Sequence, residues 1–570
     1  MLEGLSCDNL PPHSAEMGED DHERLPERPE LDQSQPSAAP APRRDLSVPF
    51  VLLATVAFFV ARIALIPRRV FDPDEFEHSH AAWSVFRGLL PYKDFFEHHT
   101  PWYYFALSPF FRWFAVDQSF EAARSFLIFA RAFSFLLAAL SVVLITRVGR
   151  LAAHRLDTGP LEGFPHPPAK DSVEPGSTPS TRRVGLLTGL FLAGQPVFIQ
   201  KTMEIRPDVP ALLFFIGALW FLLRGLSEQE NSDTVSLRSI PLRWFLGGGL
   251  CLGASIMCTQ KMLFALPGVL LGLGLWALAD RRQALVARMR AVLMVCVGVA
   301  VPALATWIGF AIHGGGRQFI YDNFLLNARW QLGSVRGVVV TLKTSWPILV
   351  LALLGASVSL HRFFRASQRH YGDVLLLCTL GGLIAGIAVV TVAYEQYCLM
   401  PLAIACLFGA KGLSFIGESL PERARTWFLV CATLPLLVLP VRDLRRSFTL
   451  RDDRQMARLR YVFEHTGPTD TVLDGWMGTQ LFRPHPLYYF FMHRELLVML
   501  SESDKESYLG PLESGRVRPS LITLDDELMA LGPRFLRFVR SNYETKDGLF
   551  YFPVRTSPLT SGGEHPSGQH

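Results

Sequence analysis

The chain has 570 residues, 49% of them hydrophobic, with a mean hydropathy of +0.24. Apolar runs of membrane-spanning length recur between residues 48 and 441, which excludes an ordinary soluble enzyme. The net charge of only +4 excludes a nucleic-acid partner, because such a partner requires a dense basic face. The eight cysteines have neither disulfide nor metal-site spacing and are expected to be free thiols.

The first 45 residues are polar, acidic and proline-rich, and they cannot bury enough apolar surface to fold. We therefore predict a disordered tail over residues 1–45. Arg43 and Arg44 precede the first apolar run, so the positive-inside rule places the tail in the cytoplasm and the segment after residue 66 outside.

About eleven apolar runs are predicted to form transmembrane helices within a membrane domain over residues 46–445. They cover residues 48–66, 125–146, 184–198, 210–223, 245–258, 262–278, 291–312, 342–360, 374–393, 399–415 and 427–441. The predicted cytoplasmic connections are rich in arginine. Three of the predicted external ones carry only Lys201, Arg206 and Lys261 as basic residues. This alternation supports the topology, and an odd number of spans places the C-terminal segment outside.

Residues 446–556 are more polar and are predicted to form a small extracytoplasmic α/β domain. The chain is thus predicted to be an all-α polytopic membrane protein with a small C-terminal α/β domain. Its expected strands and helices are 470–474, 519–525, 549–554, 454–466 and 532–543. The tail 557–570 and the linker 156–183, which includes the His-Pro run 164–168, are predicted to be flexible.

The predicted first external loop, residues 67–123, is unusually rich in acids and histidines. Six acids and four histidines fall between Phe71 and Phe105. Such groups are costly beside lipid unless they line a wet cavity, which indicates a functional site. Asp74 and Glu75 begin a predicted helix on which Asp74 and His78 share a face. The alternative is an amphipathic helix at the membrane interface whose polar face meets water.

Three motifs carry a family resemblance: DPDEFEHSHAAW, GLLPYKDFFEHHTPWYYF and IRPDVP. They resemble the GT-C superfamily of membrane glycosyltransferases, in particular bacterial protein O-mannosyltransferases and lipid A aminoarabinose transferases. The resemblance implies an inverting enzyme of the bacterial plasma membrane that takes a sugar from a polyprenyl-phosphate carrier. The expected acceptor is a hydroxyl of a glycan, lipid or protein on the external face.

The resemblance also implies roles for the loop residues. Asp74 matches the general base, with Glu75 as its partner. Glu97, His98 and His99 match the cluster that contacts acceptor or lipid phosphate, although some lipid A-modifying relatives have lysine in place of His98. No metal or other cofactor is predicted to be required.

The leaving phosphate needs positive charge or hydrogen-bond donors. The external candidates for contacting the phosphate are Arg206, Lys261, Arg329, Tyr394 and Tyr397. His78 and Asp208 are the remaining residues expected to bind substrate. Structural alternatives remain open for several of these residues. Arg206 could pair with Asp208 as a buried ion pair, Lys261 could extend to the surface, and the tyrosines could belong to an interfacial belt.

Two further features are predicted to be structural: Arg131 should extend outward from its span, and Asp525 to Glu527 should begin an exposed loop. Two other function classes are the alternatives to an enzyme. A transporter or flippase for a lipid-linked sugar would place charges at mid-span in repeated halves, and no duplicated half is visible here. An inactive scaffold with the same fold would keep the motifs without the chemistry.

Overall fold

The computed structural model describes residues 47–153, 179–230, 240–279, 285–330, 335–365, 370–390 and 392–554. All of them belong to one compact unit. The predicted tails, the His-Pro run and most of the linker 156–183 lie outside the described residues.

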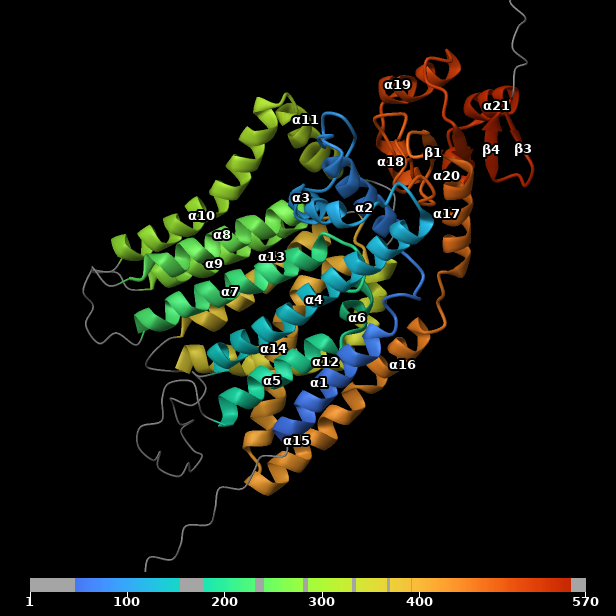
Figure 1. Ribbon diagram of the computed structural model, residues 1–570. Helices are drawn as coiled ribbons and strands as arrows, with labels where there is room; N and C mark the ends of the chain where they lie inside the picture. Colours follow the sequence, from blue (N-terminus) through green and yellow to red (C-terminus); the bar gives the residue numbers. More distant parts are fainter. Residues whose placement is uncertain are drawn as a thin grey trace, which may run out of the picture. The chain divides into compact units, whose positions relative to one another are not determined.

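Helices, most of them long and apolar, lie side by side and form the body of this unit (Figure 1). Each of the eleven predicted apolar runs lies in or overlaps one of them. The helices are α1 (Ser47–Ile63), α4 (Phe120–Ala153), α5 (Pro179–Ala193), α7 (Asp208–Glu230), α8 (Leu242–Cys258), α9 (Ala265–Leu278), α10 (Leu285–Ile312), α12 (Arg336–Arg365), α13 (Tyr371–Val389), α14 (Leu399–Glu418), α15 (Glu422–Leu436) and α16 (Val438–Ser447). Within the described residues, eight helical segments are long and apolar enough to cross a membrane, while α1 and α8 are shorter apolar helices. The chain is therefore a multi-pass membrane protein.

The predicted helix over 184–198 is wrong in its extent. Helix α5 ends at Ala193, and a separate short helix, α6 (Pro196–Lys201), follows. Proline disfavours helical backbone at the residue before it, and Gln195 accordingly has φ −67° and ψ 130°. This break carries Lys201 to the end of the bundle, where the charged loops gather.

Small residues allow some of the helices to approach closely. Gly355 on α12 faces the backbone of Phe408 and Gly412 on α14, where an added Cβ would collide with main-chain atoms. Gly249 on α8 and Gly298 on α10 meet in the same way. Close packing through glycine is a common means of helix association inside a membrane, where burial from water offers little driving force.

Several short elements lie at one end of the bundle: α2 (Pro73–Phe86), α3 (Trp102–Leu107), the 3₁₀ segments η1 (Ser108–Trp113), η3 (Gln260–Phe264), η5 (Asn327–Arg329) and η6 (Glu395–Cys398), α11 (Gly316–Ile320) and the π-helical η4 (Tyr321–Leu326). They come from segments that the charge pattern assigned to the same side of the membrane. Their convergence is thus consistent with the predicted alternation of the loops.

The C-terminal part folds around a four-stranded sheet of order β1-β2-β4-β3, in which β1 and β2 are parallel and the other pairs are antiparallel. Its elements are α17 (Asp453–His465), β1 (Val472–Asp474), α18 (Arg494–Met499), α19 (Glu502–Glu513), β2 (Leu521–Thr523), α20 (Asp526–Met529), α21 (Pro533–Asn542), β3 (Tyr543–Thr545) and β4 (Phe550–Pro553). The three predicted strands and both predicted helices are confirmed. Strand β3 was not predicted.

This C-terminal part packs against the first loop through a shared hydrophobic cluster. The Phe482 ring centroid lies 5.6 Å from that of Phe111 and 6.2 Å from that of Trp83 on α2. The Phe96 amide donates to the Tyr488 carbonyl oxygen at 2.8 Å. The site at this end of the bundle is therefore built from both parts.

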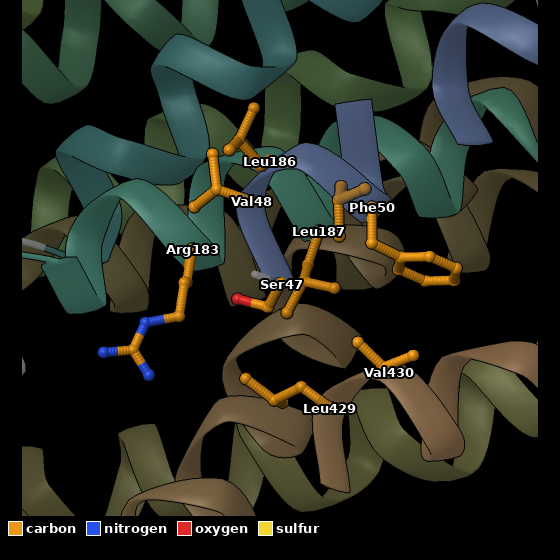
Figure 2. A pocket seen from close by; sticks show the side chains of 9 residues that line it. Ser47, Val48, Phe50, Arg183, Leu186, Leu187, Leu429 and Val430 are labelled. Carbon is orange, nitrogen blue, oxygen red and sulfur yellow. The ribbon is translucent and has the colours of Figure 1, made fainter. Parts of the chain in front are cut away.

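A small apolar pocket lies elsewhere, where α1, α5 and α15 meet (Figure 2). Its volume is only about 10 Å³, and Val48, Leu187 and Leu429 are among its lining residues. That space is no larger than one water molecule needs, so we assign it no ligand.

Candidate active site

Helix α2 begins with a complete capping box. The Asp72 side chain accepts a hydrogen bond from the Asp74 amide, and the Glu75 side chain accepts one from the Asp72 amide. Pro73 occupies the first turn, where its missing N–H costs nothing. Residues 75–84 are all buried, so the alternative of an interfacial helix with a wet polar face is wrong.

Glu75 is held by Arg131 on α4. Two guanidinium nitrogens of Arg131 lie 2.7 and 2.8 Å from the two carboxylate oxygens of Glu75, and both side chains are fully buried. Arg131 also donates to the carbonyl oxygens of Ile66, Arg69 and Val70. The prediction that Arg131 extends outward is therefore wrong. The pair fastens the start of α2 to the bundle.

Asp74, the next residue in the chain, points to a different partner. Its Oδ2 lies 2.6 Å from Nη2 of Arg206, and 21% of its side-chain surface remains exposed. Burial raises the pKa of the Asp74 carboxyl, although Arg206 opposes that shift. Asp74 thus combines a fixed orientation with a raised pKa, whereas the carboxylate of Glu75 is occupied by Arg131 and by the Asp72 and Ile205 amides.

Arg206 is the centre of a buried ion network. Besides Asp74, it lies 3.2 Å from Glu204, 3.6 Å from Asp72 and 3.6 Å from Asp208. The alternative in which Arg206 only pairs with Asp208 is thus incomplete, because Asp208 is one of four carboxylates around it. A planar guanidinium with several donors suits such a junction.

Lys201 forms a second junction in this network. Its Nζ lies 3.2 Å from carboxylate oxygens of Asp72, Glu204 and Glu395. Arg69 adds another contact to Glu204, also at 3.2 Å. Burial alone would raise the pKa of Asp72, but Lys201 and Arg206 lower it below its ordinary value.

Lys261 has fewer acidic partners. Its Nζ lies 3.3 Å from Asp208 and 4.7 Å from the centre of the Tyr397 ring. Lys261 therefore does not extend to the surface, and Tyr397 supports it by a cation–π contact. Tyr394 lies one residue before η6, and Asp74 and Arg206 are among the charges acting on it. Arg329 instead lies over the Tyr321 ring at 5.8 Å.

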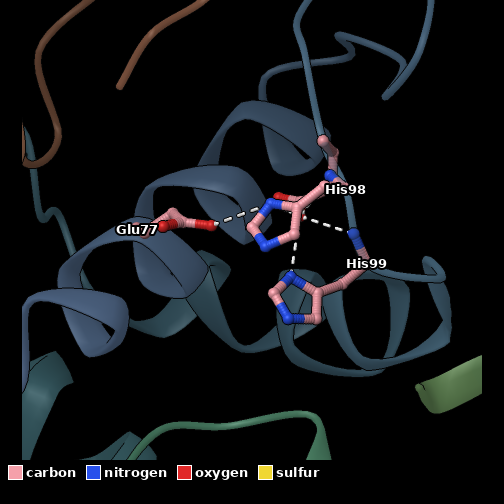
Figure 3. A group of neighbouring side chains, drawn as sticks. Glu77, His98 and His99 are labelled. Atoms are coloured by element: carbon pink, nitrogen blue, oxygen red, sulfur yellow. Dashed lines mark hydrogen bonds and ion pairs between the residues drawn. The ribbon is translucent and has the colours of Figure 1, made fainter. Parts of the chain in front are cut away.

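A second cluster joins Glu77 of α2 to the segment Glu97 to His99 (Figure 3). Nδ1 of His98 lies 3.7 Å from Glu77 and 3.8 Å from Glu97, and Nδ1 of His99 lies 3.2 Å from Glu97. Burial raises the pKa of Glu97 to about 8 and lowers the pKa values of both histidines. His78 lies beside this cluster: its ring centroid is 4.9 Å from that of His99, and its Nδ1 lies 3.1 Å from the Tyr104 hydroxyl.

The C-terminal part contributes to the second cluster. Trp476 donates its indole N–H to Glu77 at 3.3 Å. Asp525 accepts from the Trp476 and Leu528 amides at 2.9 and 2.8 Å and is buried. The prediction that Asp525 begins an exposed loop is therefore wrong, since its carboxylate caps α20 and positions Trp476.

The sequence pointed to Asp72 and Glu77 only as two of the six acids of the first loop, without a role for either. It gave no site role to four other residues of the two clusters: Arg69, Lys201, Glu204 and Trp476. Lys201 and Glu204 stand in the polar link between the third and fourth predicted spans, and that link was the available signal. Trp476 had no signal of its own, because nothing in its neighbourhood indicates contact with the first loop.

A cavity of about 360 Å³ lies beside the ion network. Glu395, which contacts Lys201, forms part of its wall. Apolar side chains from α6 and α12 and the arginines of α16 also line it, including Val197, Val340, Arg442 and Arg446. The cavity wall is thus mixed: it has an apolar part, and its two arginines face a lining that also holds the acids Glu395 and Asp443.

Residues 180–308 match a family described as dolichyl-phosphate-mannose-protein mannosyltransferase. This segment includes the link that carries Lys201 and Arg206, and it includes Lys261. No curated protein matches the sequence.

The structure resembles ArnT from Cupriavidus metallidurans. Against the apo structure the TM-score is 0.56 with 14% identity over 89% of this chain and 98% of ArnT. Against the structure bound to undecaprenyl phosphate the TM-score is 0.54 with 13% identity over 89% and 97% of the two chains. The archaeal oligosaccharyltransferase AglB from Archaeoglobus fulgidus, in complex with an inhibitory peptide and a dolichol-phosphate, gives a TM-score of 0.52 with 12% identity over 90% and 75%. The chain thus shares the fold of ArnT and AglB, and residues 180–308 match the mannosyltransferase family model.

Proposed function

We propose that this protein is an inverting glycosyltransferase that moves a sugar from a polyprenyl-phosphate carrier to a hydroxyl acceptor. The observation that carries the proposal is Asp74, a partly exposed carboxylate held 2.6 Å from Arg206 at the junction of the charged loops. Support also comes from two proteins of the same fold that were solved with polyprenyl or dolichyl phosphate bound.

Asp74 acts as the general base. The acceptor oxygen attacks the anomeric carbon from the face opposite the phosphate, and its proton passes to the Asp74 carboxylate. The bond from the anomeric carbon to the phosphate oxygen breaks, and the electron pair leaves with the polyprenyl phosphate. One carboxylate suffices because the leaving phosphate is already a stable anion and needs no general acid. A glycoside hydrolase, in contrast, generally uses a pair of carboxyl groups. Glu75 positions the start of α2 for this step.

Lys261 receives the leaving phosphate. Lys201 and Arg206 each contact three or more carboxylates, whereas Lys261 contacts one carboxylate of the network, that of Asp208. Its positive charge is the least neutralised of the three, and 13% of its side-chain surface is exposed. A fixed cation at this point stabilises the charge that develops on the phosphate oxygen in the transition state.

The cavity beside Lys201 accommodates the lipid end of the donor. Its apolar wall suits isoprenoid carbons, and Arg442 and Arg446 supply charge for a phosphate that enters or leaves. Membrane lipids border the same helices. The acceptor approaches on the side of the second cluster, where Glu97, His98, His99 and His78 bind it. The C-terminal part, which packs against this cluster, helps to bind the acceptor.

We place the site on the external face of a bacterial plasma membrane, with the N-terminus in the cytoplasm. The positive-inside pattern supports this orientation, and the family resemblance supports the choice of membrane. Protease added to intact spheroplasts should then remove a tag fused to the C-terminus and spare a tag at the N-terminus. The reverse pattern of protection would overturn this orientation.

Mass spectrometry of the cell envelope tests the proposed function, with and without the gene. The expected result is one envelope component that lacks a single glycosyl mass, restored by the wild-type gene and not by Asp74→Asn. A lipid-linked sugar that accumulates or changes sides, with full rescue by Asp74→Asn, would instead indicate a transporter.

A further inference from the structure

Trp330 connects the two charged clusters of the site. It follows the 3₁₀ segment η5, and its indole stacks on the His98 ring of the second cluster, with centroids 5.5 Å apart and an interplanar angle of 28°. The same side chain interacts with Tyr394. Asp74 and Arg206 of the ion network are among the charges that act on Tyr394. One indole therefore lies between the side of the site that holds Asp74 and the side that holds the second cluster.

Neighbouring groups hold this indole in a fixed orientation. The Trp330 and His493 ring centroids lie 5.5 Å apart, so a residue of the C-terminal part supports the indole. Asn327 donates its side-chain amide to the His98 carbonyl oxygen at 2.7 Å, and its own carbonyl oxygen accepts from the Trp330 amide at 3.3 Å. A ring that is already fixed suits a binding surface, because a ligand that covers it costs little additional side-chain entropy.

Part of the indole remains accessible to a ligand. Trp330 is half-buried, and the rings behind it are closely packed: Phe491 and Trp476 lie 5.5 and 5.1 Å from the His493 ring. The face of an indole is large and apolar, and it carries the negative part of the ring quadrupole. The C–H bonds of a sugar ring carry a partial positive charge. A pyranose face with several C–H groups therefore fits such a ring.

We propose that the Trp330 indole is the platform on which the ring of the transferred sugar stacks. This inference rests on the proposed function. Displacement with inversion aligns the acceptor oxygen, the anomeric carbon and the phosphate oxygen, so the sugar lies between the phosphate at Lys261 and the acceptor at the second cluster. Trp330 contacts Tyr394 on the first side and His98 on the second. The donor sugar is thus a pyranose that presents a face of C–H groups.

Stacking fixes the plane of the sugar and directs its anomeric carbon towards the oxygen that Asp74 deprotonates. Trp330 supplies neither a proton nor a nucleophile, so it acts on affinity for the sugar and on its orientation. A carrier without a sugar leaves the indole uncovered, and its binding should not depend on Trp330. A merely structural residue would instead affect both ligands alike.

The test compares two probes on the purified full-length protein in detergent: polyprenyl phosphate, and the polyprenyl-phosphate sugar that envelope mass spectrometry identifies. Trp330→Leu should bind the sugar-bearing donor roughly tenfold more weakly than the wild type, with a similar loss in kcat/KM and unchanged affinity for polyprenyl phosphate. Trp330→Phe keeps an aromatic face and should recover most of the lost affinity. Trp113→Leu is the matched control, because Trp113 is an exposed tryptophan of the first loop.

The melting temperature of each variant checks its fold. If Trp330→Leu does not fold, Trp330→Phe carries the comparison, with a smaller loss that is again confined to the sugar-bearing donor. Wild-type affinity for that donor in the variants, or an equal loss for both probes, would overturn the platform while sugar transfer by the wild type still supports the proposed function. No transfer by the wild type would overturn the proposed function, and the platform with it.

Discussion

The carboxylate of Asp74 lies 2.6 Å from the guanidinium of Arg206, and this contact joins helix α2 to the link before α7. Arg206 simultaneously contacts Asp72, Glu204 and Asp208. The proposed base is thus oriented by a residue that is itself fixed by three other acids.

Replacing Arg206 by lysine keeps the positive charge but should still lower kcat/KM. Lysine lacks the planar fork, so it cannot hold Asp74 and the other carboxylates together. Loss of one charge-assisted hydrogen bond costs about 1.5–3 kcal/mol, which corresponds to roughly 10–100-fold in kcat/KM. Arg68→Lys, an exposed arginine at the same end of the molecule, should transfer sugar at the wild-type rate. Equal kcat/KM for both variants would contradict the orienting role of Arg206.

Glu75→Gln should act mainly on stability. It leaves the buried Arg131 guanidinium without its counter-ion, and breaking a buried ion pair from one side costs about 3–5 kcal/mol. Thermal unfolding in detergent should show a clearly lower melting temperature. A wild-type melting temperature together with lost turnover would show instead that Glu75 takes part in the chemistry directly, as the sequence predicted.

Lys261→Ala should weaken use of the donor. The ammonium group is proposed to meet the phosphate, so its loss should raise KM for the lipid-linked sugar and lower kcat, with kcat/KM reduced by roughly tenfold or more. Lys93→Ala is the matched control, because Lys93 is an exposed lysine of the first loop. If the two alanine variants have the same donor KM, the phosphate is bound elsewhere.

The acid limb of the kcat/KM–pH profile should reflect the ionisation of the Asp74 carboxyl. Burial raises the pKa of this carboxyl, while Arg206 and Lys201 oppose the shift and Asp72 reinforces it. Only the ionised form can accept the acceptor proton. Activity is therefore present above the raised pKa and lost as the pH falls through it, at a higher pH than for an ordinary aspartate. A kcat/KM profile that stays flat until the protein unfolds would speak against Asp74 as the base.

The sequence predicted the membrane fold, and it singled out the loop in which the proposed site lies, because both features leave local signals. Apolar length identified the helices, and six acids with four histidines marked the first loop. Asp74 and Arg206 were both named from the sequence, and the structure brings them into contact.

The partner of each charge was harder to predict. Arg131 stands 56 residues from Glu75, early in an apolar run, and its burial depends on a carboxylate that only the fold brings to it. Trp476 reaches Glu77 across 399 residues because the C-terminal part packs on the first loop. Such long-range contacts follow from tertiary packing, and no spacing in the sequence encodes them.

The most direct test of the account is single-turnover sugar transfer by purified Asp74→Asn. The assay uses the polyprenyl-phosphate sugar that envelope mass spectrometry identifies, with Glu121→Gln as the control because Glu121 is an exposed acid at the start of α4. Asp74→Asn should keep its melting temperature and its binding of polyprenyl phosphate but transfer sugar about 10²–10⁴-fold more slowly, whereas Glu121→Gln should match the wild type. Transfer by Asp74→Asn at a rate close to that of the wild type would contradict the account.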